Sequence, residues 1–317
     1  MFKLTIILLL TAVTRAALGC DADTHPGSNR ITVMSGGQQQ HIDLVMPRSF
    51  ERGKPVPLVI GLHPSSGDGA ILDKDTGLSA AANAKGFAVM LPDGAIKLPR
   101  PDGSGDGHYW NIPGVPLVTG DAVPKGTRDD VRFIADAIDH VVKHNCVDAR
   151  RIYVTGMSGG ARMSSMVGCR LADKITAVAP IAGLRAGRAA APEFSEPDAG
   201  DCQPSRPIAV MAVHGTDDQT NPFPGGQGLR WGYSVERAVA RWASLDQCGA
   251  APSAEKVSAH VTRVRYSSCA AGSEVVLYRI DASRDQGGGH IWPGGLRDQS
   301  KIELNATQLV LEFFASH

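Results

Sequence analysis

The sequence has no excess of charge of either sign, since its 317 residues include 32 lysines and arginines against 32 aspartates and glutamates. Nucleic-acid-binding domains usually carry a basic surface, and this balance gives no indication of one. No internal repeat, low-complexity tract or linker interrupts the chain. Hydrophobic residues make up 43% of it, enough for a sizeable core. We therefore expect a single globular domain over residues 20–317.

Long hydrophobic runs are also missing, apart from one near the N-terminus. That run, Leu4–Val13, follows Lys3 and is too short to span a membrane as a helix. The small residues Ala17 and Gly19 follow it and are typical of a signal-peptide cleavage site. We expect residues 1–19 to be a signal peptide, the mature protein to be secreted or periplasmic, and no transmembrane segment elsewhere.

Cysteine is scarce, but its number is informative. Six cysteines follow the predicted cleavage site, and an even number in an exported protein fits three disulfides. Cys20 comes directly after that site, which leaves a lipid-anchored protein as the alternative. Ala17 and Leu18 are unfavourable in a lipidation signal, and lipidation would leave five cysteines. The expectation is a protein without a lipid anchor. The six are Cys20, Cys146, Cys169, Cys202, Cys248 and Cys269.

Apolar runs alternate with segments of helical periodicity along the chain. This order predicts a mainly parallel, doubly wound sheet of the α/β class. The long segment 97–126 is rich in glycine and proline, and loops of this length are often functional. Thr127 is expected to cap the helix that follows this loop. The predicted strands are 31–35, 41–46, 57–62, 87–91, 151–155, 175–181, 208–213 and 274–280, and the other predicted helices are 78–85, 161–173, 233–245 and 304–315.

The pentapeptide Gly156–Gly160, with the sequence GMSGG, lies between the predicted strand 151–155 and the predicted helix 161–173. A G-x-S-x-G sequence in this context is typical of a nucleophile elbow, in which a sharp turn exposes the serine above the sheet. In a glycine-rich chain the same sequence also arises by chance. If the elbow is real, Ser158 is the nucleophile of an α/β-hydrolase, and the N–H of Gly159 at the helix N-terminus binds an anion.

A catalytic acid is expected after the serine, because in this fold the triad follows the order Ser, Asp, His. The predicted strand 208–213 runs directly into His214–Asp218, with the sequence HGTDD. Carboxylates just past the carboxyl end of a parallel strand lie where ligands collect in such sheets. Asp218 is the expected acid. Asp217 is the alternative, and either one can instead be a turn residue.

Three histidines follow Asp218, and one of them must be the base. His317 is the terminal residue. His260 lies in the alternating segment 257–262, which places it on the solvent face of a predicted strand. His290 lies in a glycine-rich loop that can approach the serine closely. We predict that His290 is the general base.

The second donor of the oxyanion hole is expected after the strand that ends at Leu62. Pro64 has no N–H, so Ser65 is the candidate donor beside Gly159. Acyl transfer by a serine, a histidine and an aspartate needs no metal or organic cofactor. The sequence has no cysteine and histidine cluster with zinc-binding spacing. Two other histidines, each closing a predicted strand, are expected to have structural roles: His63 and His214.

With these residues, the chain resembles the polyhydroxybutyrate depolymerase-like esterases, a group that merges with the feruloyl and acetylxylan esterases. The resemblance covers nearly all of residues 20–317 and rests on these segments: 57–67, 129–134, 151–160, 177–183, 214–218 and 289–294. It implies an α/β-hydrolase fold, Asp218 as the acid and His290 as the base. The chain departs from the group at Pro64, where glycine is usual, and at Gly159, where Asn, Gln or Ala is common.

The resemblance also implies three disulfides. Cys20–Cys146 would be similar to the N-terminal bridge of the feruloyl esterases and would exclude lipidation of Cys20. Cys169–Cys202 would tie the elbow helix to a later loop. Cys248–Cys269 would flank a surface insertion.

Aromatic residues on the predicted loops are candidates for substrate contacts: Trp110, Trp231, Trp292 and Phe223. Ordinary packing is the alternative for each. The expected partner is an ester, possibly polymeric. Polyhydroxyalkanoate or related hydroxyacid esters are the first hypothesis, and feruloyl or acetylxylan esters are the second. Another polymeric ester, a peptide substrate and a non-catalytic exported binding protein are weaker alternatives.

Overall fold

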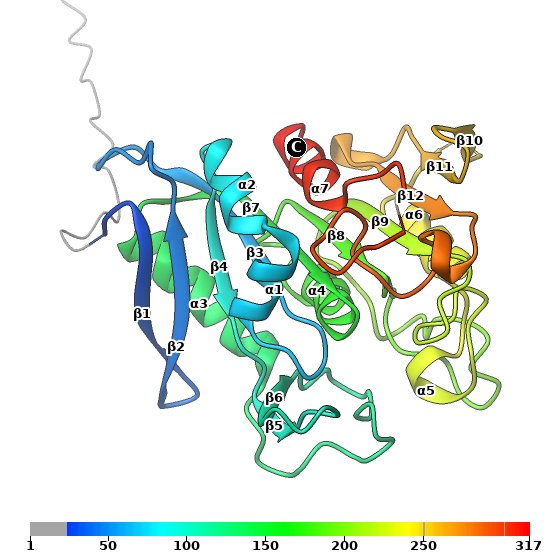
Figure 1. The fold of residues 1–317 in the computed structure, drawn as a ribbon, viewed down its shortest axis with the longest axis horizontal. Helices are drawn as coiled ribbons and strands as arrows, with labels where there is room; N and C mark the ends of the chain where they lie inside the picture. The colour runs from blue at the N-terminus through cyan, green and yellow to red at the C-terminus, as the bar shows by residue number, and fades with distance from the viewer. Residues whose placement is uncertain (1–23, 250, 301) are drawn as a thin grey trace, which may run out of the picture.

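A ten-stranded sheet runs through the molecule, and its strand order is β1-β2-β4-β3-β7-β8-β9-β12-β11-β10 (Figure 1). The structure is a computed structural model that describes residues 24–249, 251–300 and 302–317. Strands from β4 to β12 pair in parallel, while antiparallel hairpins form both edges. The strands are β1 Gly27–Ser35, β2 Gln38–Met46, β3 Val56–Leu62, β4 Ala88–Pro92, β7 Val147–Met157, β8 Ala177–Ile181, β9 Ala209–Gly215, β10 Ser253–Lys256, β11 Val261–Tyr266 and β12 Val275–Ile280.

Helices cover both faces of this sheet. The helices α3, α4 and α6 contribute to one core, and α1, α2 and α7 contribute to the other. The central strands are buried on both faces, which is why their sequences are almost continuously apolar. The predicted α/β class and the mainly parallel sheet are confirmed. The helices are α1 Gly69–Thr76, α2 Leu78–Ala84, α3 Asp130–His144, α4 Gly159–Arg170, α5 Gly228–Trp231, α6 Val235–Leu245 and α7 Ala306–Ala315, with 3₁₀ turns η1 Ala270–Gly272 and η2 Arg284–Gln286.

The segment 97–126 differs from the prediction because it is not structureless. Its first part pairs as a separate hairpin of β5 Ile96–Pro99 and β6 Asp106–Tyr109. This hairpin lies beyond the carboxyl end of the main sheet's parallel strands, at the same end as α5 (Figure 1). The remainder packs Leu117 against the hairpin. The hairpin strands are short and lack a clear apolar alternation, so the sequence pattern did not reveal them.

Two other predictions about local structure are wrong. Thr127 does not cap α3, because Asp129 is the N-cap and its carboxylate accepts from the N–H of Arg132 at 3.0 Å. His260 does not lie on a strand. It is exposed in the turn between β10 and β11, where the N–H of Val257 bonds the carbonyl of Val261. The alternating pattern there spans the end of one strand, a turn and the start of the next.

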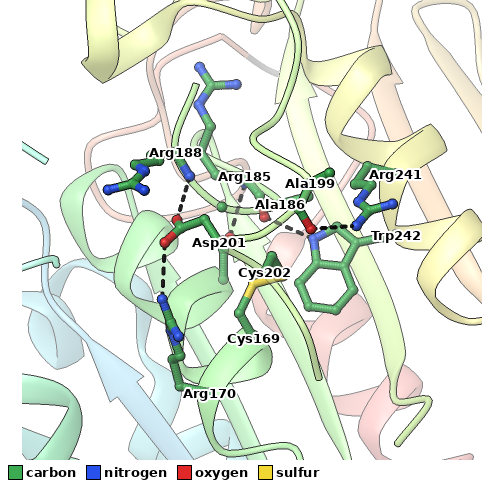
Figure 2. Close-up of a disulfide and its surroundings, with 12 residues drawn as sticks. Cys169, Arg170, Arg185, Ala186, Arg188, Ala199, Asp201, Cys202, Arg241 and Trp242 are labelled. Atoms are coloured by element: carbon green, nitrogen blue, oxygen red, sulfur yellow. Dashed lines mark hydrogen bonds and ion pairs between the residues drawn. A yellow bond between two sulfur atoms is a disulfide. The ribbon is translucent and has the colours of Figure 1, made fainter. Parts of the chain in front are cut away.

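Disulfides join Cys169 to Cys202 and Cys248 to Cys269, the two pairs that lie within the described residues and that the family resemblance implies. The first ties α4 to the loop before β9 (Figure 2). Close to it, Asp201 accepts from Arg170 and from the backbone of Arg188. The predicted signal peptide, residues 1–19, and Cys20 with its predicted bond to Cys146 lie outside the described residues. Among the helices that the structure describes, none is long and apolar enough to cross a membrane.

Asp246, at the end of α6, is fully buried and accepts a hydrogen bond from the N–H of Ile208 at 3.2 Å. Burial raises the pKa of its carboxyl from 3.8 to about 7, although the Ile208 bond lowers it. The folded protein therefore binds this proton more tightly than the unfolded chain does. The resulting stabilisation is complete below about pH 4 and is lost as the pH rises to about 7.

We expect Asp246→Asn to flatten the fall in the free energy of unfolding between about pH 4 and about pH 7, because the amide does not ionise. The effect should be a few kcal/mol at the upper end. Urea unfolding followed over this pH range measures it. The exposed Asp139→Asn is the matched control. An unchanged pH dependence in the Asp246 variant would contradict the assignment.

Candidate active site

Ser158 lies in a sharp turn between β7 and α4. Its backbone has φ 56° and ψ −113°, a conformation that L-residues rarely adopt, and its N–H bonds the carbonyl of Ile181 at 3.0 Å. Close packing explains the following glycine, because a Cβ on Gly160 would lie 2.0 Å from the carbonyl oxygen of Leu62. This strained, glycine-flanked geometry is that of a nucleophile elbow.

The loop after β3 brings Ser65 against the start of α4. A Cβ on Gly159 would lie 2.4 Å from Ser65 Oγ and 3.1 Å from its backbone nitrogen. Gly159 is the first residue of α4, so its N–H has no acceptor within the helix. The N–H of Ser65 has no hydrogen-bond partner among the described residues. The two predicted oxyanion donors are therefore neighbours in space.

The Ser65 loop is held by its own hydrogen bonds, even though Pro64 stands where glycine is usual. The carbonyl of Pro64 accepts from Gly67 N–H at 2.9 Å, and Ser66 donates to the carbonyl of His108 at 3.0 Å. His63 is fully buried, and its Nε2 accepts from the N–H of Gly94. Burial lowers the pKa of His63 to about 4, so it is neutral and structural, as predicted.

Asp218 follows β9 and is 2% exposed. Its Oδ2 lies 2.7 Å from His290 Nδ1 and 3.3 Å from His214 Nε2, and its Oδ1 accepts from the backbone of Thr220 and Asn221, each at 2.8 Å. Burial alone would raise the pKa of this carboxyl. The hydrogen bonds from the two histidines outweigh it and hold the pKa well below its usual range. Asp218 is therefore ionised.

Asp217 has a different environment, although it is adjacent in sequence. Its carboxylate accepts from the side chain of Gln219 at 2.7 Å and from the N–H of Arg284 at 2.9 Å. It has no hydrogen bond to His290 in the part of the chain that the structure describes. These contacts give Asp217 the role of a turn residue that ties two loops together.

Glycines bring the His290 loop against the end of β9. A Cβ on Gly215 would lie 2.2 Å from the carbonyl oxygen of Gly288. The same carbonyl accepts from the N–H of Asp217 at 2.9 Å. The loop therefore packs directly on the strand end that carries Asp218, which places His290 beside that carboxylate.

Ser158 and His290 line the same cavity of about 680 Å³ at the carboxyl ends of the strands. Within the described residues, Ser158 and His290 make no hydrogen bond to each other. The cavity is of the size that suits a small-molecule or chain-end ligand.

The predicted aromatic contacts divide into two groups. Trp231 and Trp292 line the cavity with Ser158. Trp110 does not line it, because this side chain is buried, stacks on His63 at 4.6 Å between ring centroids and donates to the His63 carbonyl. Phe223 is also buried, and it packs edge-on against His214. Both side chains are buried and neither lines this cavity, so their predicted substrate contacts stay predictions.

Several residues that line the cavity were not predicted. Leu72, Asp75 and Thr76 come from α1, and Val118 comes from the long loop. Arg230 also lines the cavity, and it donates to the carbonyl of Pro116 at 2.8 Å. No cluster of metal-binding side chains is found among the described residues. The sequence carried no signal for Arg230, because α5 is one short turn within an irregular loop.

No known family model matches the chain, but curated relatives do. It is 31% identical to feruloyl esterase B of Piromyces equi over 250 residues, which cover 77% of this chain and 41% of that protein. It is 28% identical to poly(3-hydroxyalkanoate) depolymerase C of Paucimonas lemoignei over 143 residues, which cover 44% and 31% respectively. In both alignments the chain spans less than half of the relative's length.

Solved structures agree on the fold. The acetyl xylan esterase of Aspergillus awamori matches with a TM-score of 0.58 over 92% of this chain and 100% of that chain, at 13% identity. This likeness concerns the fold alone. Of the two sequence relatives, one is an esterase by name and the other is a depolymerase. The chain therefore has the α/β-hydrolase fold and is similar in sequence to a feruloyl esterase and to a polyhydroxyalkanoate depolymerase.

Proposed function

We propose that the protein is an exported serine hydrolase of carboxylic esters. The observation that carries the proposal is the 2.7 Å contact between His290 and the buried, ionised Asp218, at a cavity that the strained Ser158 also lines. Export is supported by the predicted signal peptide and by the disulfides, which persist in oxidising compartments.

In the proposed mechanism, His290 Nε2 accepts the hydroxyl proton of Ser158 as the oxygen attacks the ester carbon. Asp218 accepts a hydrogen bond from Nδ1, which fixes the imidazole tautomer and stabilises the imidazolium. The N–H groups of Gly159 and Ser65 bind the oxyanion. His290 then protonates the leaving alcohol, and water releases the acyl group from Ser158 by the same steps in reverse order.

For the substrate, we propose hydroxyalkanoate-type esters, including short oligomers. The cavity has an apolar wall near Ser158, which suits an alkyl acyl chain. This wall is formed by Leu72, Trp231 and Trp292. Feruloyl or acetylxylan esters are the second candidate. The observation in their favour is that the alignment with feruloyl esterase B extends over 77% of the chain.

Replacing Ser158 with alanine removes the proposed nucleophile and should lower kcat on p-nitrophenyl esters by roughly 10⁵–10⁶-fold. Ser164→Ala is the control, because Ser164 lies on the same helix and, among the residues that the structure describes, its hydroxyl donates only to the carbonyl of Gly160. It should retain most of the wild-type rate. Equal activity of the Ser158 variant and the wild-type protein would refute the mechanism.

Asp217 and Asp218 are adjacent in sequence, so the same substitution at each position tests which of them is the catalytic acid. Asp218→Asn should lower kcat by about 10⁴-fold, because the amide no longer favours the reactive tautomer of His290. Asp217→Asn should retain nearly full activity, since its contacts are with Gln219 and Arg284. Steady-state kinetics on one ester checks both, and a reversed order would move the acid to Asp217.

The two substrate proposals separate in a direct comparison. We expect kcat/KM to be higher for hydroxybutyrate oligomers than for methyl ferulate, because the walls around Ser158 favour a flexible aliphatic acyl chain. Chromatographic release of hydroxybutyrate and ferulate measures the two rates. A preference for methyl ferulate would favour the feruloyl ester proposal and leave the serine mechanism intact.

A further inference from the structure

Two buried arginines next to the catalytic cavity have no carboxylate partner in the described part of the chain. Arg162 on α4 is 3% exposed, and Arg185, which follows β8, is 4% exposed. Arg162 Nε and Nη1, and Arg185 Nε and Nη2, are buried and have no hydrogen-bond partner among the described residues. A buried ionised group normally has both a counter-charge and hydrogen bonds, so this pair is exceptional.

Neighbouring arginines show what is missing. Arg170 has an ion pair with Asp201, and Arg188 has one with Asp198. Neither Arg162 nor Arg185 has a carboxylate within ion-pair distance in the described part of the chain. Within residues 24–249, 251–300 and 302–317, the only carbonyl that accepts a hydrogen bond from the Arg185 guanidinium is that of Tyr233, at 3.1 Å.

Burying two guanidinium groups without counter-charges costs free energy, and stacking on the indole of Trp231 offsets part of that cost. The guanidinium carbon of Arg162 lies 4.3 Å from the indole centroid, and that of Arg185 lies 4.6 Å from it. Such stacking stabilises a cation but leaves the in-plane N–H groups unbonded. Burial lowers the pKa of Arg185 to about 10, so this arginine is still cationic at neutral pH.

The pair is close to the catalytic cavity. Arg162 lies four residues beyond Ser158 on the same helix, which corresponds to about 6 Å of helix rise. Trp231 lines the main cavity while its ring contacts both arginines. A small void of about 10 Å³ lies beside the arginines, and it shares Ile112 with a second void that meets the main cavity at Arg230. This void has room for about one water molecule, so a ligand carboxylate also needs the space that the Trp231 ring fills.

We propose that Arg162 and Arg185 bind a carboxylate carried by the substrate, which enters from the catalytic cavity when the Trp231 ring turns away from the two guanidinium groups. Two guanidinium groups with free N–H donors match the planar, bidentate geometry of a carboxylate. This inference rests on the proposed ester hydrolysis and narrows its substrate class to esters with a free acid end, such as hydroxyalkanoate dimers and short oligomers. In such a dimer the acid end lies only a few bonds from the scissile ester.

The test compares the 3-hydroxybutyrate dimer as the free acid with its methyl ester. The wild-type protein should hydrolyse the free acid with a kcat/KM about tenfold higher, mainly through a lower KM, because hydrogen bonds to charged groups are worth this much. Arg162→Gln and Arg185→Gln should each abolish the preference. Arg188→Gln is the matched control, since Arg188 borders the same void but has its own carboxylate, and it should keep the preference.

The ratio of the two substrates within each variant separates binding of the acid end from general loss of activity. Equal rates for acid and methyl ester in the wild-type protein would overturn the inference and leave ester hydrolysis standing, even if the arginine variants fail to fold. Failure of the wild-type protein on both substrates would instead refute the proposed function. If the preference is absent but free 3-hydroxybutyrate or acetate inhibits methyl ester hydrolysis in an arginine-dependent way, the site binds free carboxylates and the substrate assignment is wrong.

Discussion

The contact between the end of β3 and the start of α4 is the constraint on which the site depends. Gly160 packs so closely on the carbonyl of Leu62 that no side chain fits between them. This contact fixes the turn at Ser158 and brings Ser65 beside Gly159. The proposed nucleophile and both proposed oxyanion donors are therefore parts of one packed junction, and their relative positions do not rely on a flexible loop.

Near this junction, the buried Asp218 carboxylate and the buried arginine pair differ in how far their hydrogen-bonding groups are satisfied. The Asp218 carboxylate is surrounded by donors from His290, His214 and the following backbone, so it keeps its charge despite burial. Arg162 and Arg185 are equally buried, but most of their donors lack acceptors within the described residues. The first arrangement is complete without a ligand. The second has unused binding capacity, which is why it points to a substrate group.

The sequence predicted the features that depend on local pattern. The elbow at Ser158, the strand leading to Asp218 and the glycine-rich loop of His290 all carry compact signals in a few adjacent residues, and the structure brings these three residues to one region. The parallel sheet was predictable because its buried strands are almost continuously apolar.

Features that depend on tertiary contacts could not be predicted. Nothing local distinguishes Trp110, which packs under the site, from Trp231, which lines it. The turn at His260 has the alternating pattern of a strand, because two short strands follow each other with little between them. The arginine pair comes from α4 and from the loop after β8, and only the fold reveals that both side chains lie against the same indole.

The hydrogen bond between Arg230 and the carbonyl of Pro116 bears on which parts of the cavity can vary in sequence among related proteins. It connects two irregular segments that are 114 residues apart in sequence and meet at the rim of the cavity. Neither segment contributes Ser158, Asp218 or His290. The width of the entrance can therefore change through insertions, deletions or substitutions in either segment, while the strands and turns that hold the reactive groups keep their geometry.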